Sequence, residues 1–283
     1  MHDGPVSKTG FIVAIFVSLL FSFASSLSSQ TNHSFVIFCD VGQGDASYIH
    51  LKPDIDILID AGKGSSVLNC LGKHMPPNDK VIEIAFLSHF QNDHYGGYLS
   101  LLPRYAIKRL LVSDSMIPST DSARLLATLQ RSGTIVETLY AGDSVRVTSA
   151  EFKMLWPARD YTQASSRQED PNNKSQIMLF TFNKHSVLYT GDASPQTLSR
   201  LSQQAIPKVD ILKIPHHGSK NGLNEKFFLL ADPTYSMISV GKNNSYGHPS
   251  PEILEMLEKS KTKILRTDIF GDVVFSLEPE GYP

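Results

Sequence analysis

The sequence predicts a layered α/β protein, and three observations lead to that prediction. Short apolar runs that are typical of buried strands alternate with segments that are typical of helices, along both halves of the chain. With 283 residues, 41% of them hydrophobic, the chain can bury a substantial core as one large domain or two halves. Several apolar runs end directly in histidine, aspartate or glycine, so chemically active side chains are expected at the ends of buried strands.

Composition narrows the class of protein further. Charged residues make up 19% of the chain and the formal net charge is −2, which argues against a generally basic nucleic-acid binder and against disorder. The two cysteines, Cys39 and Cys70, have neither the spacing of a metal-binding pair nor that of a disulfide-rich framework. The sequence leaves open whether they form a disulfide bond.

The N-terminus predicts export. Residues 11–24 form an uninterrupted apolar run that has the length of a signal-peptide core and is short for a membrane span, and small residues follow it. We expect cleavage to remove about residues 1–28 and to leave one domain at 33–283 with no stable membrane span, in the periplasm or outside the cell. The alternative is that the segment remains as an uncleaved anchor.

The elements are predicted from apolar runs and turn signals. Strands are expected at residues 34–39, 46–51, 56–59, 81–87, 107–112, 135–140, 177–182, 186–190 and 210–215. Helices are expected at residues 65–74, near 98–102, and at 121–132, 196–204 and 251–259, whereas the polar segment 159–173 is expected to be a surface loop.

Two imidazoles, a carboxylate and two glycines follow the strand at 81–87, in the sequence SHFQNDHYGG of residues 88–97. Histidine nitrogen and carboxylate oxygen are ligands that zinc and similar divalent ions prefer. Gly96 and Gly97 permit close approach of the backbone. The stretch therefore predicts a metal site, although a solvated polar loop is the simpler alternative.

Two later strands end in similar residues. Asp192 follows the strand at 186–190, where it can be a metal ligand or the cap of the helix that follows. His216 and His217 follow the strand at 210–215, and since neighbours on an extended chain point in opposite directions, only one of them is expected to reach a given metal.

These motifs resemble the metallo-β-lactamase superfamily. Residues 88–97 resemble its metal motif H-x-[HD]-x-D-H, with Gln91 in place of the usual His or Asp. The sequences FCDVGQGD (38–45), DAG (60–62) and SVGKNNSYGHP (239–249) are similar to the exported hydrolase domain of ComEC-type DNA-uptake proteins. The resemblance implies a four-layer αββα sandwich whose site lies where the strand ends of both sheets meet.

The resemblance also implies roles for individual residues. The metal ligands it implies are His89, Asp93, His94, Asp192 and His216, holding one or two ions of zinc or manganese. Asp93 and His248 are expected to be catalytic, His248 through substrate contact or proton transfer, with a structural role for His248 as the alternative. Residues implied to contact substrate or to support the ligands are Asp40, Asp60, Gln91, Asn173, Ser175, His217, Ser219, Asn244 and Tyr246. The family's third histidine for the first metal has no equivalent here, because Asn173 and Ser175 occupy that region.

The function predicted from this resemblance is that of an exported metal-dependent hydrolase, a phosphodiesterase or nuclease with DNA as its substrate. A local excess of two positive charges between Lys208 and His248 is compatible with phosphate binding, but equally with a solvated surface. The alternatives are hydrolysis of another bond, such as a lactam, lactone or thioester, and a non-catalytic domain whose metal site has degenerated at Gln91. Protein partners are not indicated.

Overall fold

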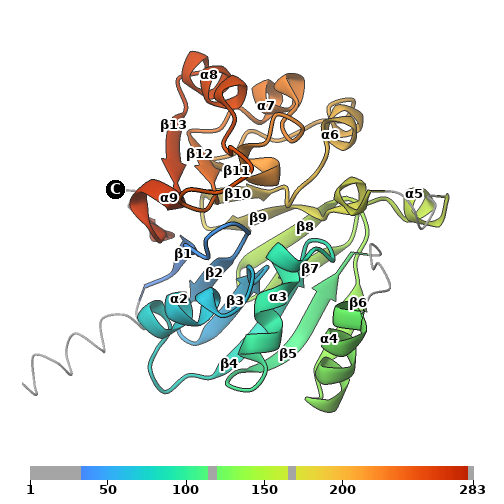
Figure 1. Ribbon diagram of the computed structural model, residues 1–283, viewed down its shortest axis with the longest axis vertical. Helices are drawn as coiled ribbons and strands as arrows, with labels where there is room; N and C mark the ends of the chain where they lie inside the picture. Colours follow the sequence, from blue (N-terminus) through green and yellow to red (C-terminus); the bar gives the residue numbers. More distant parts are fainter. Residues whose placement is uncertain (1–32, 114–119, 165–169, 280–283) are drawn as a thin grey trace, which may run out of the picture.

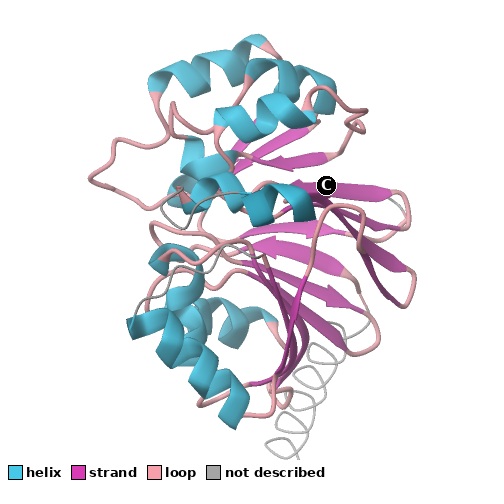
Figure 2. Ribbon diagram, turned by 90° about the vertical axis from the view of Figure 1, so that its right-hand side faces the viewer, coloured by secondary structure: helices cyan, strands magenta, loops and turns pink. Residues whose placement is uncertain are grey.

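The computed structural model describes residues 33–113, 120–164 and 170–279. Two sheets pack face to face, and helices cover the outer face of each, so the four-layer αββα sandwich expected above is confirmed (Figures 1 and 2). The predicted signal peptide lies outside the described residues. Within the described ranges, no helix has both the length and the apolar character needed to cross a membrane.

The first sheet contains seven strands in the order β14-β1-β2-β3-β4-β5-β6. Strands β3, β4, β5 and β6 run parallel, so their C-terminal ends share one edge. The bounds are β14 Val273–Ser276, β1 Phe35–Phe38, β2 Ser47–Leu51, β3 Ile55–Ile59, β4 Val81–Leu87, β5 Ala106–Val112 and β6 Ile135–Thr138. Its outer face is covered by α2 (Ser66–His74), α3 (Asn92–Leu101) and α4 (Thr120–Arg131) (Figure 1).

The second sheet also contains seven strands, in the order β13-β12-β11-β10-β9-β8-β7. Strands β10, β11, β12 and β13 are parallel. The bounds are β13 Lys263–Arg266, β12 Tyr235–Ile238, β11 Ile211–Lys213, β10 His185–Tyr189, β9 Ile177–Phe182, β8 Ala150–Trp156 and β7 Ser144–Val147. Helices α6 (Pro195–Leu201), α7 (Glu225–Ala231) and α8 (Pro251–Lys259) cover it, and α9 (Thr267–Phe270) leads back to β14.

Three apolar clusters account for the layering. The central cluster lies between the sheets and includes Phe86, Phe152 and Phe180, whose rings pack in a row with centroids 4.7 and 4.8 Å apart. The other two clusters lie between each sheet and its own helices. Most strands of both sheets are therefore buried on both faces, which explains why they appear in the sequence as continuous apolar runs.

The structure differs from the sequence prediction in several places; strands β13 and β14 and helices α7 and α9, for example, were not predicted. Strands β7 and β8 were not expected, because β7 is exposed and alternating rather than apolar. The segment 159–173, expected to be a surface loop, contains helix α5 (Arg159–Ala164) and part of a 3₁₀ turn (Pro171–Lys174). Helix α3 begins at Asn92, so Asp93 and His94 lie in its first turn rather than in a loop.

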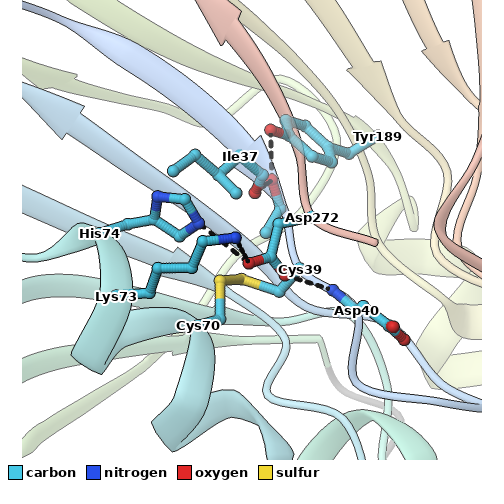
Figure 3. The surroundings of a disulfide bond; sticks show 9 residues. Ile37, Cys39, Asp40, Cys70, Lys73, His74, Tyr189 and Asp272 are labelled. Carbon is cyan, nitrogen blue, oxygen red and sulfur yellow. Dashed lines mark hydrogen bonds and ion pairs between the residues drawn. A yellow bond between two sulfur atoms is a disulfide. The ribbon is translucent and has the colours of Figure 1, made fainter. Parts of the chain in front are cut away.

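Cys39 and Cys70 form a disulfide bond between the end of β1 and helix α2 (Figure 3). Beside it, the Asp272 carboxylate accepts hydrogen bonds from the backbone N–H of Asp40 at 2.9 Å and from Lys73 Nζ at 3.2 Å. His74 Nε2 lies 2.9 Å from the same carboxylate. These contacts lower the pKa of Asp272 to about 2, with the His74 contact contributing most. The disulfide and this cluster fix α2 to the β1 and β14 edge of the first sheet.

Candidate metal centre

The candidate site lies where the C-terminal ends of strands from both sheets meet. Asp60 follows β3 and His89 follows β4 in the first sheet. Asp192 follows β10 and His217 follows β11 in the second. Because the two sheets pack face to face, their parallel strands bring residues that are far apart in the sequence to one edge of the sandwich.

Four side chains form the centre of the site. Asp93, His94, Asp192 and His217 each place one nitrogen or oxygen atom within 4.8 Å of the others, and we call them the metal group. Asp192 Oδ2 lies 3.3 Å from His94 Nε2 and 3.4 Å from His217 Nε2, which in turn lies 3.4 Å from Asp93 Oδ2. Two imidazoles and two carboxylates are a donor set suited to a divalent ion.

The unpartnered atoms of these side chains show that the metal group fits a cation. His94 Nε2, His217 Nε2 and both carboxylate oxygens of Asp192 are buried, and none of them has a hydrogen-bond partner among the described residues. Buried polar atoms are normally satisfied, because leaving one without a partner costs about 1–3 kcal/mol. His89 Nε2 is buried and unpartnered in the same way, and its ring centroid lies 4.2 Å from that of His94.

The opposite nitrogens of the two imidazoles are held by acceptors. His94 Nδ1 lies 2.8 Å from Asp60 Oδ2, and His217 Nδ1 lies 2.9 Å from the carbonyl oxygen of Ser239. Asp60 also accepts hydrogen bonds from Ser88, at 2.8 Å from its N–H and at 2.7 Å from its hydroxyl. Donation from Nδ1 leaves Nε2 of both rings free to bind a metal, and it fixes the ring orientation. Asp60 thus has the geometry of the supporting role expected from the sequence.

The expectation for His216 needs correction, because the structure places His217 rather than His216 in the metal group. The sequence argument assumed an extended chain. Instead both residues have left-handed backbone conformations, with φ of 51° and 55°, inside a tight 3₁₀ turn (Pro215–Gly218). This turn directs His217 towards Asp192, while His216 lines the groove outside. Two successive non-glycine residues with positive φ are costly, which is typical of a functional site.

A buried lysine lies behind the metal group, within the segment between Lys208 and His248 that carries the excess of positive charge. Lys213, the last residue of β11, is only 3% exposed; its ammonium forms an ion pair with Asp45 and donates to the carbonyl of Gly191 at 3.0 Å. It also lies 3.7 Å from Asp192 Oδ1. Asp45 approaches His217 Nδ1 at 3.2 Å. Sequence reasoning missed both residues. The signal was a charged residue beside a fully buried strand, because Asp45 lies two residues before β2 and Lys213 is the last residue of β11.

Burial and neighbouring charges shift the pKa values of the site residues. Burial disfavours protonation of His94 and His217, but neighbouring carboxylates outweigh the effect of burial. Asp192 and Asp60 raise the pKa of His94 well above its usual range. Asp192 and Asp45 raise the pKa of His217 to about 10. Burial raises the pKa of Asp93, but the nearby imidazoles of His217 and His94 together outweigh it and lower that pKa to about 2. Burial, helped by His94, lowers the pKa of His89 to about 4.

These pKa values predict that metal binding releases protons at neutral pH. Without metal, His94 and His217 are protonated at pH 7, and each must lose its proton to coordinate an ion. We therefore expect metal affinity to rise with pH between 6 and about 10, with one to two protons released per ion. Calorimetric titration in buffers of different ionisation enthalpy measures that number. A binding enthalpy that does not depend on the buffer would contradict the prediction.

Several other residues expected at the site form hydrogen bonds with neighbouring loop and helix-start groups. Ser175 Oγ accepts from the N–H of Asp192 at 3.0 Å and lies 3.4 Å from His89 Nδ1. Asn173 Oδ1 accepts from Ser194 at the start of α6, and the Ser219 hydroxyl accepts from the N–H of Asn221. Asp40 is exposed and accepts from the N–H of Gly42. Of these side chains, Ser175 is the one whose contacts reach residues beside the metal group.

A groove of about 430 Å³ opens above the metal group. It brings together Gln91, Tyr246 and His248, which the sequence had singled out, with Gln43 and Lys63, which it had not. The groove is lined by Gln43, Lys63, Gln91, Asn92, Asp93, His216, His217, Ser245, Tyr246 and His248. Asp93, whose side chain is 30% exposed, connects the metal group to this opening.

Two glycines permit the close packing around the site. A side chain at Gly44 would collide with the carbonyl oxygen of Asp93, and φ at Gly44 is +144°. A side chain at Gly191, whose φ is +47°, would collide with the Ser175 hydroxyl. Both positions therefore require glycine, because they combine positive φ with close contact.

Comparison with known proteins agrees with this geometry. The family model described as the metallo-beta-lactamase superfamily matches residues 39–242. The chain belongs to the metallo-β-lactamase superfamily. Its sequence is also 27% identical to ComE operon protein 3 of Bacillus subtilis over 94% of the chain, and 29% identical to Recombination protein 2 of Haemophilus influenzae over 93%. The alignments cover 35% and 31% of these relatives, so the chain spans about a third of their length.

Solved structures share the fold at low sequence identity. The metallo-β-lactamase fold protein YhfI from Bacillus subtilis superposes with a TM-score of 0.59 and 13% identity, covering 86% of this chain and 99% of its own. Zn(2+)-bound PqqB from Methylobacterium extorquens gives a TM-score of 0.53 and 12% identity, covering 83% of this chain and 88% of its own. These similarities confirm the superfamily fold.

Proposed function

We propose that the protein is an exported metal-dependent phosphodiesterase that acts on nucleic acid. The observation that carries this proposal is the convergence of unpartnered histidine nitrogens and carboxylate oxygens at the floor of an open groove. Such an arrangement suits a metal that must remain accessible to substrate, rather than a closed structural site.

Asp93, His94, Asp192 and His217 would hold the first ion, which we propose to be zinc or manganese. A divalent metal bound there would act as a Lewis acid and activate water at neutral pH. His89 Nε2 is adjacent and has no hydrogen-bond partner among the described residues, but the nearby Gln91 offers only a neutral amide. Asn173, in the region of the family's third histidine, is engaged with Ser194. A second ion would therefore be held weakly.

The chain's own residues would orient and neutralise the reactants. Asp93 lies at the junction of metal group and groove, where its carboxylate can orient an attacking water. His248 also lines the groove, and burial together with His217 and His216 lowers its pKa, so it is uncharged at neutral pH and suited to accept a proton. The Lys63 ammonium in the groove provides positive charge for an anionic substrate.

Nucleic acid is favoured as the substrate by the sequence relatives. Matches to ComE operon protein 3 and Recombination protein 2 cover nearly the whole chain and support a role connected with DNA. The lysine excess between residues 208 and 248 no longer adds support, because Lys213 is buried and Lys208 pairs with Asp232. Hydrolysis of a lactam, lactone or thioester, or a site without catalysis, are the alternatives that an assay must separate.

Export is also part of the proposal. The disulfide between Cys39 and Cys70 supports an oxidising compartment, such as the periplasm or the exterior, since cytosolic thiols are kept reduced. The apolar run at residues 11–24 supports a cleaved signal peptide, with the domain beginning near residue 33.

The test is cleavage of DNA and of bis-p-nitrophenyl phosphate with added manganese or zinc, compared with nitrocefin. We expect phosphodiester cleavage that depends on metal and is lost in Asp93→Ala. The matched control is Asp121→Ala, which removes an exposed carboxylate at the start of α4 and should retain activity. Nitrocefin turnover without phosphodiester cleavage would contradict the proposal in favour of another bond, and inactivity on all three with metal bound would contradict phosphodiester hydrolysis.

A further inference from the structure

Four aromatic rings form a row along the groove. Tyr246 is exposed and stacks on His248, with ring centroids 5.6 Å apart and planes inclined by 24°. His248 meets His216 edge-on at 5.9 Å, and His216 meets His217 edge-on at 6.2 Å. Since His217 belongs to the metal group, the row leads from an exposed ring directly to the proposed reaction centre.

The loop that carries Tyr246 is held in place by Asn244. Asn244 Oδ1 accepts from the N–H groups of Tyr246 at 3.2 Å and His248 at 3.0 Å. Its Nδ2 donates to the carbonyls of Gly241 at 3.0 Å and His248 at 2.6 Å. The Asn244 amide, expected either to contact substrate or to support the ligands, is therefore engaged by the loop. It fixes the backbone that presents Tyr246, so ligand binding has less conformational freedom to restrict.

The exposed ring has no evident role in packing the core. Tyr246 is 70% exposed, the largest exposed fraction among the described large hydrophobic side chains. Its partner His248 and the cation Lys63 line the same groove. A flat aromatic surface, a positive charge and a metal group within one groove match the parts of a nucleotide, which has a planar base and an anionic phosphate.

We infer that Tyr246 and His248 form a subsite that stacks an unpaired nucleobase beside the phosphodiester at the metal group. This inference rests on the proposed function, and it specifies the substrate as single-stranded nucleic acid or an unpaired end. In a duplex each base is already stacked between its neighbours and paired, so it reaches Tyr246 only after extrusion. The subsite therefore predicts preference for single strands, with stacking rather than hydrogen bonding to the base.

The test measures kcat/KM for a single-stranded oligonucleotide and for versions that carry one abasic nucleotide at successive positions from the cleaved bond. Tyr246→Ala should lower kcat/KM on the intact strand by about 5- to 150-fold, the range expected for one base–aromatic stack, whereas Tyr246→Phe, which keeps the stacking ring, should lose much less. When the abasic nucleotide occupies the position that stacks on Tyr246, kcat/KM of the wild type should fall by a similar factor relative to the intact strand. In Tyr246→Ala, the same abasic strand should be cleaved with nearly the same kcat/KM as the intact strand. Leu229→Ala, another exposed side chain, on α7, is the control and should match the wild type.

Two outcomes would overturn the subsite. In the first, Tyr246→Ala lowers kcat/KM relative to the wild type by the same factor on the intact strand and on every abasic strand. In the second, the wild type cleaves duplex in preference to single strands. Binding of the same oligonucleotides, followed by fluorescence anisotropy, separates this inference from the proposed function. Base-dependent binding that is lost in Tyr246→Ala, without any cleavage by the wild type, would support the subsite and contradict the hydrolytic function. Cleavage that Tyr246→Ala leaves unchanged would contradict the subsite alone.

Discussion

Replacing His217 by alanine is expected to abolish tight metal binding and metal-dependent hydrolysis, whereas replacing His216 should leave metal binding intact. His217 Nε2 lies 3.4 Å from both Asp93 and Asp192 and is buried without a partner among the described residues. The loss in metal affinity should exceed the roughly 10–100-fold that follows removal of a residue that only supports a ligand. Metal content after dialysis, with turnover of bis-p-nitrophenyl phosphate, measures both effects.

His216 is the matched control for His217→Ala. His216 shares the same turn and the same left-handed backbone, but it lines the groove rather than the metal group. Damage to the turn itself should therefore affect both variants, while loss of a ligand should affect one. Equal metal loss in both variants, or retention of metal in His217→Ala, would show that the site is assigned wrongly.

Replacing Lys213 by methionine is expected to destabilise the fold by about 3–5 kcal/mol, the range found when one partner of a buried ion pair is removed. The methionine fills a similar volume but removes the ammonium from between Asp45 and Asp192, so that His217 is the remaining cation in contact with Asp45. Urea unfolding of the disulfide-bonded protein without metal measures the free energy of unfolding. Lys213 thus acts as a fixed positive charge among the carboxylates, and its pKa is raised because Asp45 and Asp192 together outweigh burial.

A matched lysine provides the control for this second prediction. Lys208 forms an ion pair with Asp232 on the surface, where both side chains are more than half exposed. Lys208→Met should change stability by no more than about 1 kcal/mol, because exposed ion pairs contribute little. Adding Asp45→Asn to Lys213→Met should recover part of the loss, since the double variant no longer buries an unpaired charge. Similar stability of Lys213→Met and Lys208→Met would contradict the role assigned to the buried pair.

The sequence predicted the layers of this fold because most of its strands are buried on both faces. Strands such as β4 are continuous apolar runs, and their ends were recognisable from His89, Asp60 and Asp192. Strand β7 was missed because it is an exposed edge strand with alternating polarity and few distinctive residues. Helix α5 was missed because its six residues are mostly polar.

The site was less accessible to prediction than the fold, because its geometry depends on local backbone conformation and on tertiary burial. The choice between His216 and His217 turned on two positive φ angles that no spacing rule reveals. Lys213 resembled any surface lysine until β11 placed it between the sheets. Asn244 and Asn173 were identified as important, but whether an amide binds substrate, the backbone or another side chain depends on contacts formed only in the folded chain.

The most direct measurement is a crystal structure of the protein with manganese or zinc, with the metal located by anomalous scattering. We predict one strongly occupied ion bound by Asp93, His94, Asp192 and His217, and at most a weakly occupied second ion beside His89. An ion bound through His216, or found only near His74 and Asp272 at the disulfide, would contradict the account. An ion bound as predicted would establish a metal centre that is open to the groove. An ion bound only elsewhere would remove the basis for the proposed hydrolysis.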